Sequence, residues 1–157
     1  MTEAEAAALV FRLLGARMRS RYELQQALAR RGCSDAVGAA VLDDLESRGY
    51  VDDAKLAREY CEYRLRDRPL GRVRLERELH KRGLAPLVVS GALEQVFAST
   101  DVPGLALEAA RSHLAKLQDQ PPETARRRLW GFLQRRGFDS DTIRSVVDRL
   151  MPPTDAS

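Results

Sequence analysis

The side chains able to support acid–base or metal chemistry are few in this sequence and are not arranged for it. The chain has two histidines, His80 and His113, and no other chemically active residue type clusters around either. Cys33 and Cys61 form no Cys-x-x-Cys pair and have no histidine cluster nearby, so we expect reduced thiols in a cytosolic chain. We therefore expect no metal and no cofactor.

Two pairs of adjacent carboxylates, Asp43–Asp44 and Asp52–Asp53, raise the alternative of a metal-dependent nuclease. That chemistry needs carboxylates converging from several elements with a supporting lysine or histidine, and the sequence shows no such set. Asp52 and Asp53 instead suit the N-terminus of a helix that carries Leu56. An enzyme is thus the least favoured class, and we expect no catalytic residues.

The charged residues are more informative when the chain is taken as a whole. Its 157 residues are 44% hydrophobic, 31% charged and only 6% aromatic, which is typical of a globular helical protein rich in leucine, alanine and arginine. A formal net charge of +3 permits a nucleic-acid partner without requiring one. No apolar run approaches a membrane span and the N-terminal residues are acidic, so we expect a cytoplasmic protein without membrane contact.

The sequence repeats itself three times around a basic–glycine step, at Arg31–Gly32, Arg82–Gly83 and Arg136–Gly137. Leucines stand four and eight residues before each glycine, and an apolar ladder follows each one at matching offsets. The leucines are Leu24 and Leu28, Leu75 and Leu79, and Leu129 and Leu133; the ladders are Val41, Leu42 and Leu45, then Ala92, Leu93 and Val96, then Val146, Val147 and Leu150. Such internal repetition is the signature of a helical repeat protein.

Each unit is predicted to contain three helices. The basic–glycine step ends the second helix, because glycine adopts a positive φ and cations favour the negative end of the helix dipole. The third helix starts at Ser34, near Pro86, and at Asp139 or Ser140. Ser20 and Glu23 form a capping box for the first repeat's second helix, and Pro121–Pro122 start the third repeat's. Apolar stripes mark the first helices: Leu9, Val10, Leu13 and Leu14; Leu56, Tyr60 and Tyr63; Leu107, Ala110, Leu114 and Leu117.

The predicted fold is therefore all-α, with three tandem three-helix repeats stacked into an elongated, curved array. The repeats span residues 4–51, 52–99 and 102–151, and residues 152–157 form a flexible tail. We expect a monomer.

Positive charge gathers on the second helix of every repeat, whereas each third helix carries net negative charge. This recurrence indicates a basic surface that faces an acidic partner, either a nucleic-acid backbone or an acidic protein groove. Helical placement opposite Leu75 and Leu79 turns Arg74, Arg77 and Lys81 outward. The other candidate partner-binding residues lie just before or at the same helix, namely Arg64, Arg66, Arg68 and Arg72, or are the equivalents in the third repeat, namely Arg126, Arg127, Arg128 and Arg135.

Other arginines and the aromatic residues are assigned structural roles. Arg31, Arg82 and Arg136 fall near the leucine face, so we expect them to cap helix ends or to pair with the recurring acids Asp43, Glu94 and Asp148. The aromatic residues lie on apolar faces, where packing is favoured over base stacking. They are Tyr50, Tyr60, Tyr63, Phe97, Trp130 and Phe138.

Nearly the whole chain, from about residue 5 to 151, resembles the RecX family. The resemblance is strongest in Gly49-Tyr50-Val51-Asp52-Asp53, continuing through Ala54-Lys55-Leu56-Ala57-Arg58-Glu59-Tyr60, and in Gly71-Arg72-Val73-Arg74-Leu75-Glu76-Arg77-Glu78-Leu79 with Lys81-Arg82-Gly83-Leu84. Leu56 stands where the family usually has phenylalanine, and the first and third repeats are looser than the second.

The resemblance implies three tandem three-helix repeats and a role as a non-enzymatic regulator of the RecA recombinase. It implies binding along the RecA–single-stranded-DNA filament, with direct contact to the DNA strand as an added interaction. It further implies inhibition of RecA's strand exchange, ATP hydrolysis and coprotease function, and so a place in DNA repair and the SOS response.

One alternative is a helix-turn-helix protein that acts on DNA directly, since helix–glycine–helix units recur. Its recognition helix would be the third of a repeat, and in the first repeat that helix holds Asp35, Asp43, Asp44 and Glu46 against Arg48 alone. A helix that reads the major groove should not be the acidic helix of its repeat.

Overall fold

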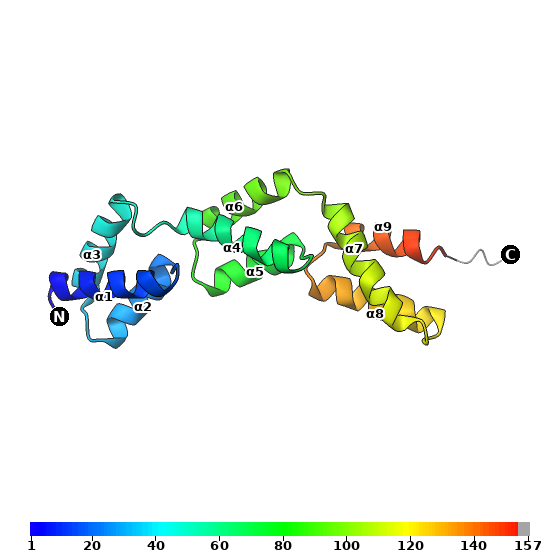
Figure 1. Cartoon of the computed structure of the whole chain (residues 1–157), viewed down its shortest axis with the longest axis horizontal. Helices are drawn as coiled ribbons and strands as arrows, with labels where there is room; N and C mark the ends of the chain where they lie inside the picture. Colours follow the sequence, from blue (N-terminus) through cyan, green and yellow to red (C-terminus); the bar gives the residue numbers. More distant parts are fainter. Residues whose placement is uncertain (154–157) are drawn as a thin grey trace. The chain divides into compact units, whose positions relative to one another are not determined.

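The computed structural model describes residues 1–153, and within them the chain is all-α (Figure 1). Nine α-helices and one short 3-10 turn, η1, follow one another without a strand in these residues. The helices are α1 (Glu3–Ala16), α2 (Arg21–Arg30), α3 (Asp35–Ser47), α4 (Asp53–Asp67), α5 (Arg72–Lys81), α6 (Pro86–Ala98), α7 (Val102–Leu114), α8 (Pro122–Arg135) and α9 (Ser140–Leu150), with η1 at Ala115–Leu117. The predicted all-α class and the three tandem three-helix repeats are confirmed. Residues 154–157 of the predicted flexible tail lie outside the described part.

The described chain divides into two compact units, and the division passes through the middle repeat. Unit 1 contains residues 1–60 and 78–92, and so holds α1, α2 and α3 with the start of α4 and the end of α5. Unit 2 begins with residues 61–77 and continues from residue 93, and so holds the end of α4, the start of α5 and all of α7, α8 and α9. In residues 1–153, no helix is both long and apolar enough to cross a bilayer.

The core of unit 1 forms where α1, α2 and α3 pack on one another (Figure 1). Leu24 and Leu28, the leucine pair predicted to face inward, are 0% and 1% exposed. They meet the apolar face of α3, where Leu42 and Leu45 are fully buried, and that of α1 at Leu9. The spacing of the leucines thus predicted the buried face correctly.

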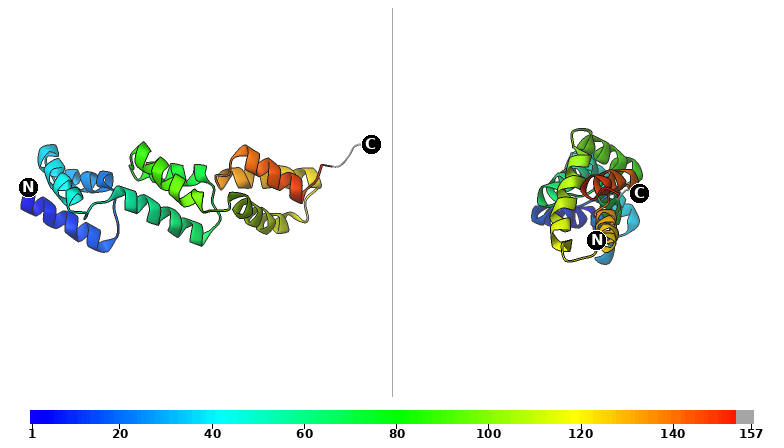
Figure 2. Two further views of the ribbon diagram at one scale, coloured as in Figure 1. Left: turned by 90° about the horizontal axis from the view of Figure 1, so that it is seen from above. Right: turned by 90° about the vertical axis from the view of Figure 1, so that its right-hand side faces the viewer.

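The core of unit 2 repeats this arrangement with α7, α8 and α9, which lie beside one another in Figure 2. Leu129 and Leu133 are both completely buried, and Ile143 and Val147 of α9 pack in the same cluster. The face of α7 is lined by small residues, among them Ala106, Ala109 and Ala110, so the helices can approach closely. The equivalent leucines of α5, Leu75 and Leu79, are also completely buried.

Helix ends follow the predicted signals with two differences. Thr2 and Ser20 both make full capping boxes, and Ser34 and Asp139 cap α3 and α9. Pro121 precedes α8 without a side-chain cap, because proline has no polar side chain to offer. Of the Asp52–Asp53 pair, Asp52 accepts from the Lys55 N–H at 3.1 Å, whereas Asp53 accepts from the Arg21 N–H at 2.9 Å and so satisfies α2 instead.

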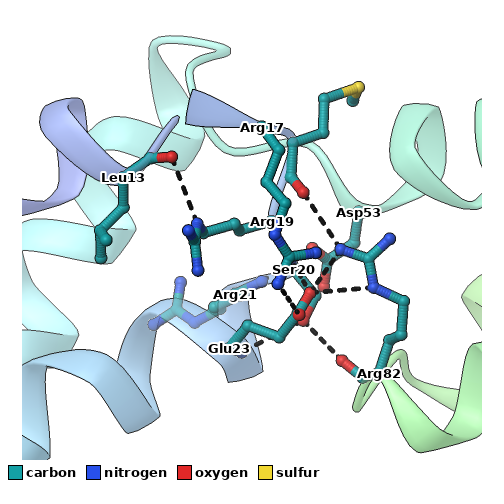
Figure 3. Close-up of polar contacts among 9 residues, drawn as sticks. Leu13, Arg17, Arg19, Ser20, Arg21, Glu23, Asp53 and Arg82 are labelled. Carbon is teal, nitrogen blue, oxygen red and sulfur yellow. Dashed lines mark hydrogen bonds and ion pairs between the residues drawn. The ribbon is translucent and has the colours of Figure 1, made fainter. Parts of the chain in front are cut away.

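The basic–glycine steps do more than end their helices, because two of them bind the start of the second helix in the preceding repeat. In unit 1, Ser20 Oγ donates to the carbonyl oxygen of Arg82 at 2.5 Å (Figure 3). The Arg82 guanidinium donates to the Glu23 carboxylate at 2.7 and 3.1 Å and to the Met18 carbonyl at 3.0 Å. It also lies over the Tyr60 ring. The end of α5 is thereby fixed to the N-terminus of α2.

We call such a contact, between a basic–glycine step and the start of the second helix of the preceding repeat, a joint. Unit 2 contains a second joint one repeat further along the chain. The Gly71 N–H donates to the Arg136 carbonyl at 2.8 Å, and the Val73 N–H donates to the Gly137 carbonyl at 3.2 Å. The Arg136 guanidinium donates to the Pro69 carbonyl at 3.2 Å. The end of α8 is thereby fixed to the N-terminus of α5 by main-chain hydrogen bonds.

These joints correct the expectation for the recurring acids. Asp43 pairs with Arg21 at 2.7 Å, and Asp148 pairs with Arg126, so neither acid pairs with an arginine of the basic–glycine steps. Arg82 and Arg136 do contact helix ends, but these belong to another repeat. The offsets in the sequence revealed which residues recur but not which of them face each other across two repeats.

Only some of the aromatic residues are packed inside the protein as expected. Phe138 is buried, and Trp130 is partly buried against the unit 2 core. Tyr63 is 64% exposed and Tyr50 is 53% exposed, so the stripe expected to place Tyr63 inward was wrong. Tyr50 still packs edge-on against Phe11 at 4.9 Å between ring centroids.

Candidate binding site

The joint of unit 2 gathers arginines from three helices. Arg64 and Arg68 come from the end of α4, Arg74 from the first turn of α5, and Arg135 and Arg136 from the end of α8. Arg74 Nη1 donates to the Arg135 carbonyl at 2.9 Å, which holds the two helix ends together. We call these five residues the joint arginines.

The electrostatics of the joint arginines show that positive charge is crowded there. The pKa of Arg136 is lowered from its ordinary value, first by burial and then by repulsion from Arg68, Arg74 and Arg64. Asp67 pairs with Arg68 at 3.3 Å and with Arg64 at 3.8 Å, so part of this charge is compensated. Such a surface attracts anions.

Four of the predicted binding residues therefore meet at this joint: Arg64, Arg68, Arg74 and Arg135. Arg68 and Arg135 are exposed, whereas Arg64 and Arg74 are half-buried. Arg74 had been placed fully outward by the helical pattern, and this was wrong because its guanidinium supports the end of α8.

The remaining predicted residues are spread along the second helices and the end of α4. Six of them are exposed and so accessible to a partner: Arg66, Arg72, Arg77, Lys81, Arg127 and Arg128. Arg126 differs, because it is half-buried, pairs with Asp148 and donates to the Met151 carbonyl at 2.7 Å. Arg126 therefore serves the packing of α8 on α9.

Sequence reasoning left out some basic residues that the structure places in hollows. Arg136 was assigned a structural role only, yet it lines a pocket with Lys116 and His113 in unit 2. In unit 1, a hollow of about 500 Å³ beside α1 and α2 is lined by Arg17, Arg19, Arg30 and Arg31 with Tyr22. Arg17 and Arg19 lie in the loop between helices, where no repeat offset could indicate them.

The carboxylates considered for catalysis have structural partners instead. Besides Asp43, Arg21 binds Glu46 at 2.5 Å, and these hydrogen bonds raise the pKa of Arg21 against the opposing effect of burial. Burial raises the pKa of Asp53, which accepts from the Arg21 N–H. In residues 1–153, no three His, Cys, Asp or Glu side chains gather as ligands for a metal ion.

Comparison with known proteins finds similarity along the whole repeat array. Residues 6–45 match the family description "RecX, first three-helix domain", residues 52–93 match "RecX, second three-helix domain", and residues 104–147 match "RecX, third three-helix domain". These ranges contain the three basic–glycine steps.

Individual proteins similar to this chain carry the same family name. The chain is 39% identical over 149 residues to the regulatory protein RecX of Mycolicibacterium vanbaalenii, covering 91% of this chain and 80% of that protein. It is 32% identical over 142 residues to the regulatory protein RecX of Chlorobium phaeobacteroides, covering 90% and 91%. The crystal structure of RecX from Lactobacillus salivarius has the same fold, with a TM-score of 0.85 at 15% identity over 94% of this chain and 96% of that one.

Proposed function

Because the chain belongs to the RecX family of regulatory proteins, we propose that it regulates the RecA recombinase by binding the filament that RecA forms on single-stranded DNA. It acts without catalysis and inhibits strand exchange, ATP hydrolysis and coprotease function. The filament is its partner, with direct contact to the DNA strand as an added interaction.

The observation that carries the proposal is the convergence of the joint arginines. The charges of Arg64, Arg68 and Arg74 act on Arg136 in one place in unit 2, and Arg135 joins them through its carbonyl oxygen. Of these residues, Arg68 and Arg135 are exposed. A RecA–DNA filament offers an anionic strand and carboxylate-bearing protein surface, and a crowded cationic surface is attracted to either.

The repeats supply a reason for binding a filament in particular. We infer that each of the repeats, spanning residues 4–51, 52–99 and 102–151, presents the basic residues of its second helix. A filament likewise presents the same subunit surface at regular intervals. Several modest contacts then act together with a high effective concentration. The monomer needs no strong single contact to remain bound.

The proposal is tested by measuring RecA's ATP hydrolysis on single-stranded DNA while this protein is added at substoichiometric ratios. The wild-type chain should inhibit hydrolysis. The double variant Arg68→Glu/Arg135→Glu should need about tenfold more protein for the same inhibition, because it reverses two exposed charges of the site.

The matched control is Arg144→Glu/Arg149→Glu, which makes the same change of charge on exposed residues of α9. It should inhibit as the wild type does. Equal loss in both double variants would show that net charge alone matters, and inhibition by neither wild type nor variants would refute regulation of RecA.

A further inference from the structure

A pocket of about 240 Å³ in unit 2 shares Arg68 and Arg136 with the joint arginines. It lies where the end of α4 meets α7 and α8, and its charged lining comes from all three: Asp67 and Arg68, Glu108 and His113 with Lys116 beyond α7, and Arg136. Its volume is below the range of roughly 300–1,000 Å³ typical of sites for whole small molecules. A pocket of this size suits one compact charged group.

Three residues of the lining, His113, Phe132 and Arg136, are held in place by stacking on one another. The His113 imidazole lies parallel to the Phe132 ring, with 3.9 Å between centroids and an interplanar angle of 4°. The Arg136 guanidinium lies over the same ring at 4.6 Å from its centroid and is held by the Pro69 carbonyl. Hydrogen-bond donors held in this way need little ordering when a ligand arrives.

The charge in the pocket is positive in spite of its two acids. Asp67 is engaged by Arg68 and Arg64, and Glu108 is an exposed residue of the lining. The pKa of His113 is lowered from 6.5, first by burial and then by repulsion from Lys116, Arg135 and Arg136. No acid outweighs these cations at His113.

We propose that this pocket is a binding site for a single phosphate group, held by Arg136, Arg68 and Lys116 with an N–H of His113 as a further donor. Guanidinium groups match the geometry and charge of phosphate oxygens, and Lys adds a point charge. The phosphate belongs either to a nucleic-acid backbone or to a free phosphorylated molecule, and the chemistry of recognition is shared. The site shares Arg68 and Arg136 with the surface of the proposed function, but phosphate binding is measured on this chain alone and so is tested apart from the regulation of RecA.

The bound phosphate should be visible at His113. A dianion beside the imidazole favours the protonated form, so it should raise the pKa of His113 by about one unit. The chain has only two histidines, and His80 is exposed on α5 outside the pocket, so it serves as an internal reference.

The experiment is a proton NMR titration of both imidazoles in the full chain against pH, with and without inorganic phosphate. Sodium chloride at matched ionic strength controls for simple screening, which also weakens repulsion among cations. A rise at His113 with phosphate beyond that with chloride, and none at His80, is the expected result. A short oligothymidylate in place of phosphate identifies the source: a rise at lower concentration indicates a strand backbone, and a rise with phosphate alone indicates a free molecule.

The variant Lys116→Ala should weaken phosphate binding without disturbing the fold. Lys116 is exposed, so its removal should leave stability nearly unchanged, raise the pKa of His113 in phosphate-free buffer, and shrink the further rise that phosphate causes. Lys55→Ala is the matched control in α4 of unit 1 and should behave as the wild type. If phosphate, oligothymidylate and chloride all shift His113 equally, the pocket holds no phosphate and the proposal is overturned.

Discussion

Arg82 and Glu23 show how one residue pair joins two repeats. Their side chains are only 17% and 20% exposed, and Arg82 adds hydrogen bonds to Met18 and a stacking contact with Tyr60. Burial alone would raise the pKa of Glu23, but the hydrogen bond from the Ser20 N–H and the Arg82 guanidinium outweigh it and lower that pKa. The pair is thus better satisfied in the fold than in an unfolded chain.

Arg82→Ala should therefore destabilise the chain by about 1.5–3 kcal/mol, because it removes hydrogen bonds to a partly buried charge. Urea unfolding followed by circular dichroism measures this. Arg31→Ala is the control, because Arg31 holds the equivalent position in the first repeat and is exposed. Among the described residues its side chain has no hydrogen bond or ion pair, so the change should cost under about 0.5 kcal/mol. Similar losses in both variants would contradict the role of the joint.

The same pair predicts a dependence on pH. Because the pKa of Glu23 is lowered in the folded state, its contribution is fully present above the ordinary value of 4.5 and is lost as pH falls through the folded value. The difference in unfolding free energy between wild type and Arg82→Ala should be constant near neutral pH. It should shrink in acid, as pH falls through the pKa of Glu23 in the folded state. Unfolding measured at several pH values checks this, and a difference that grows in acid would show that Glu23 is not the partner.

At the scale of elements, the joints need glycine for close approach as well as for conformation. Gly83 and Gly137 have φ of 77° and 92°. A Cβ on Gly83 would overlap the Tyr22 side chain, and one on Gly137 would overlap the backbone of Arg74. Gly32 has a φ of 82° but has nothing within 4 Å of such a Cβ.

Gly137→Ala and Gly32→Ala should consequently differ. Both changes cost about 1–2 kcal/mol for the left-handed conformation. Gly137→Ala adds roughly 1–3 kcal/mol of overpacking, since the α5 backbone cannot yield as a flexible side chain can. Thermal unfolding of the two variants measures the difference, and equal destabilisation would mean that the end of α8 does not press on α5.

The elements themselves could be predicted from the sequence to a large extent. Leucine spacing identified the buried faces of α2, α5 and α8, and the glycine steps and the serine and aspartate caps located the helix ends. The partners of Arg82, Arg74 and Arg126 could not be predicted, because a repeat offset shows which positions are equivalent and not which ones touch across repeats. Long arginine side chains reach partners that helical periodicity does not define.

For the whole molecule, the stacking of three repeats into an elongated array stays a prediction from the sequence. A compact chain of this length has a radius of gyration of roughly 15 Å, and stacked repeats should exceed that value. Small-angle X-ray scattering on the monomer measures it. A value at the compact limit would contradict linear stacking.

We propose that the joint arginines are the surface by which the molecule binds its partner. The most direct measurement is the affinity of the full chain for a RecA–single-stranded-DNA filament, determined by co-sedimentation for wild type, Arg68→Glu/Arg135→Glu and Arg144→Glu/Arg149→Glu. We predict that the Arg68 and Arg135 variant binds about tenfold more weakly, while the α9 variant binds as the wild type does. Wild-type affinity in the Arg68→Glu/Arg135→Glu variant would contradict the claim.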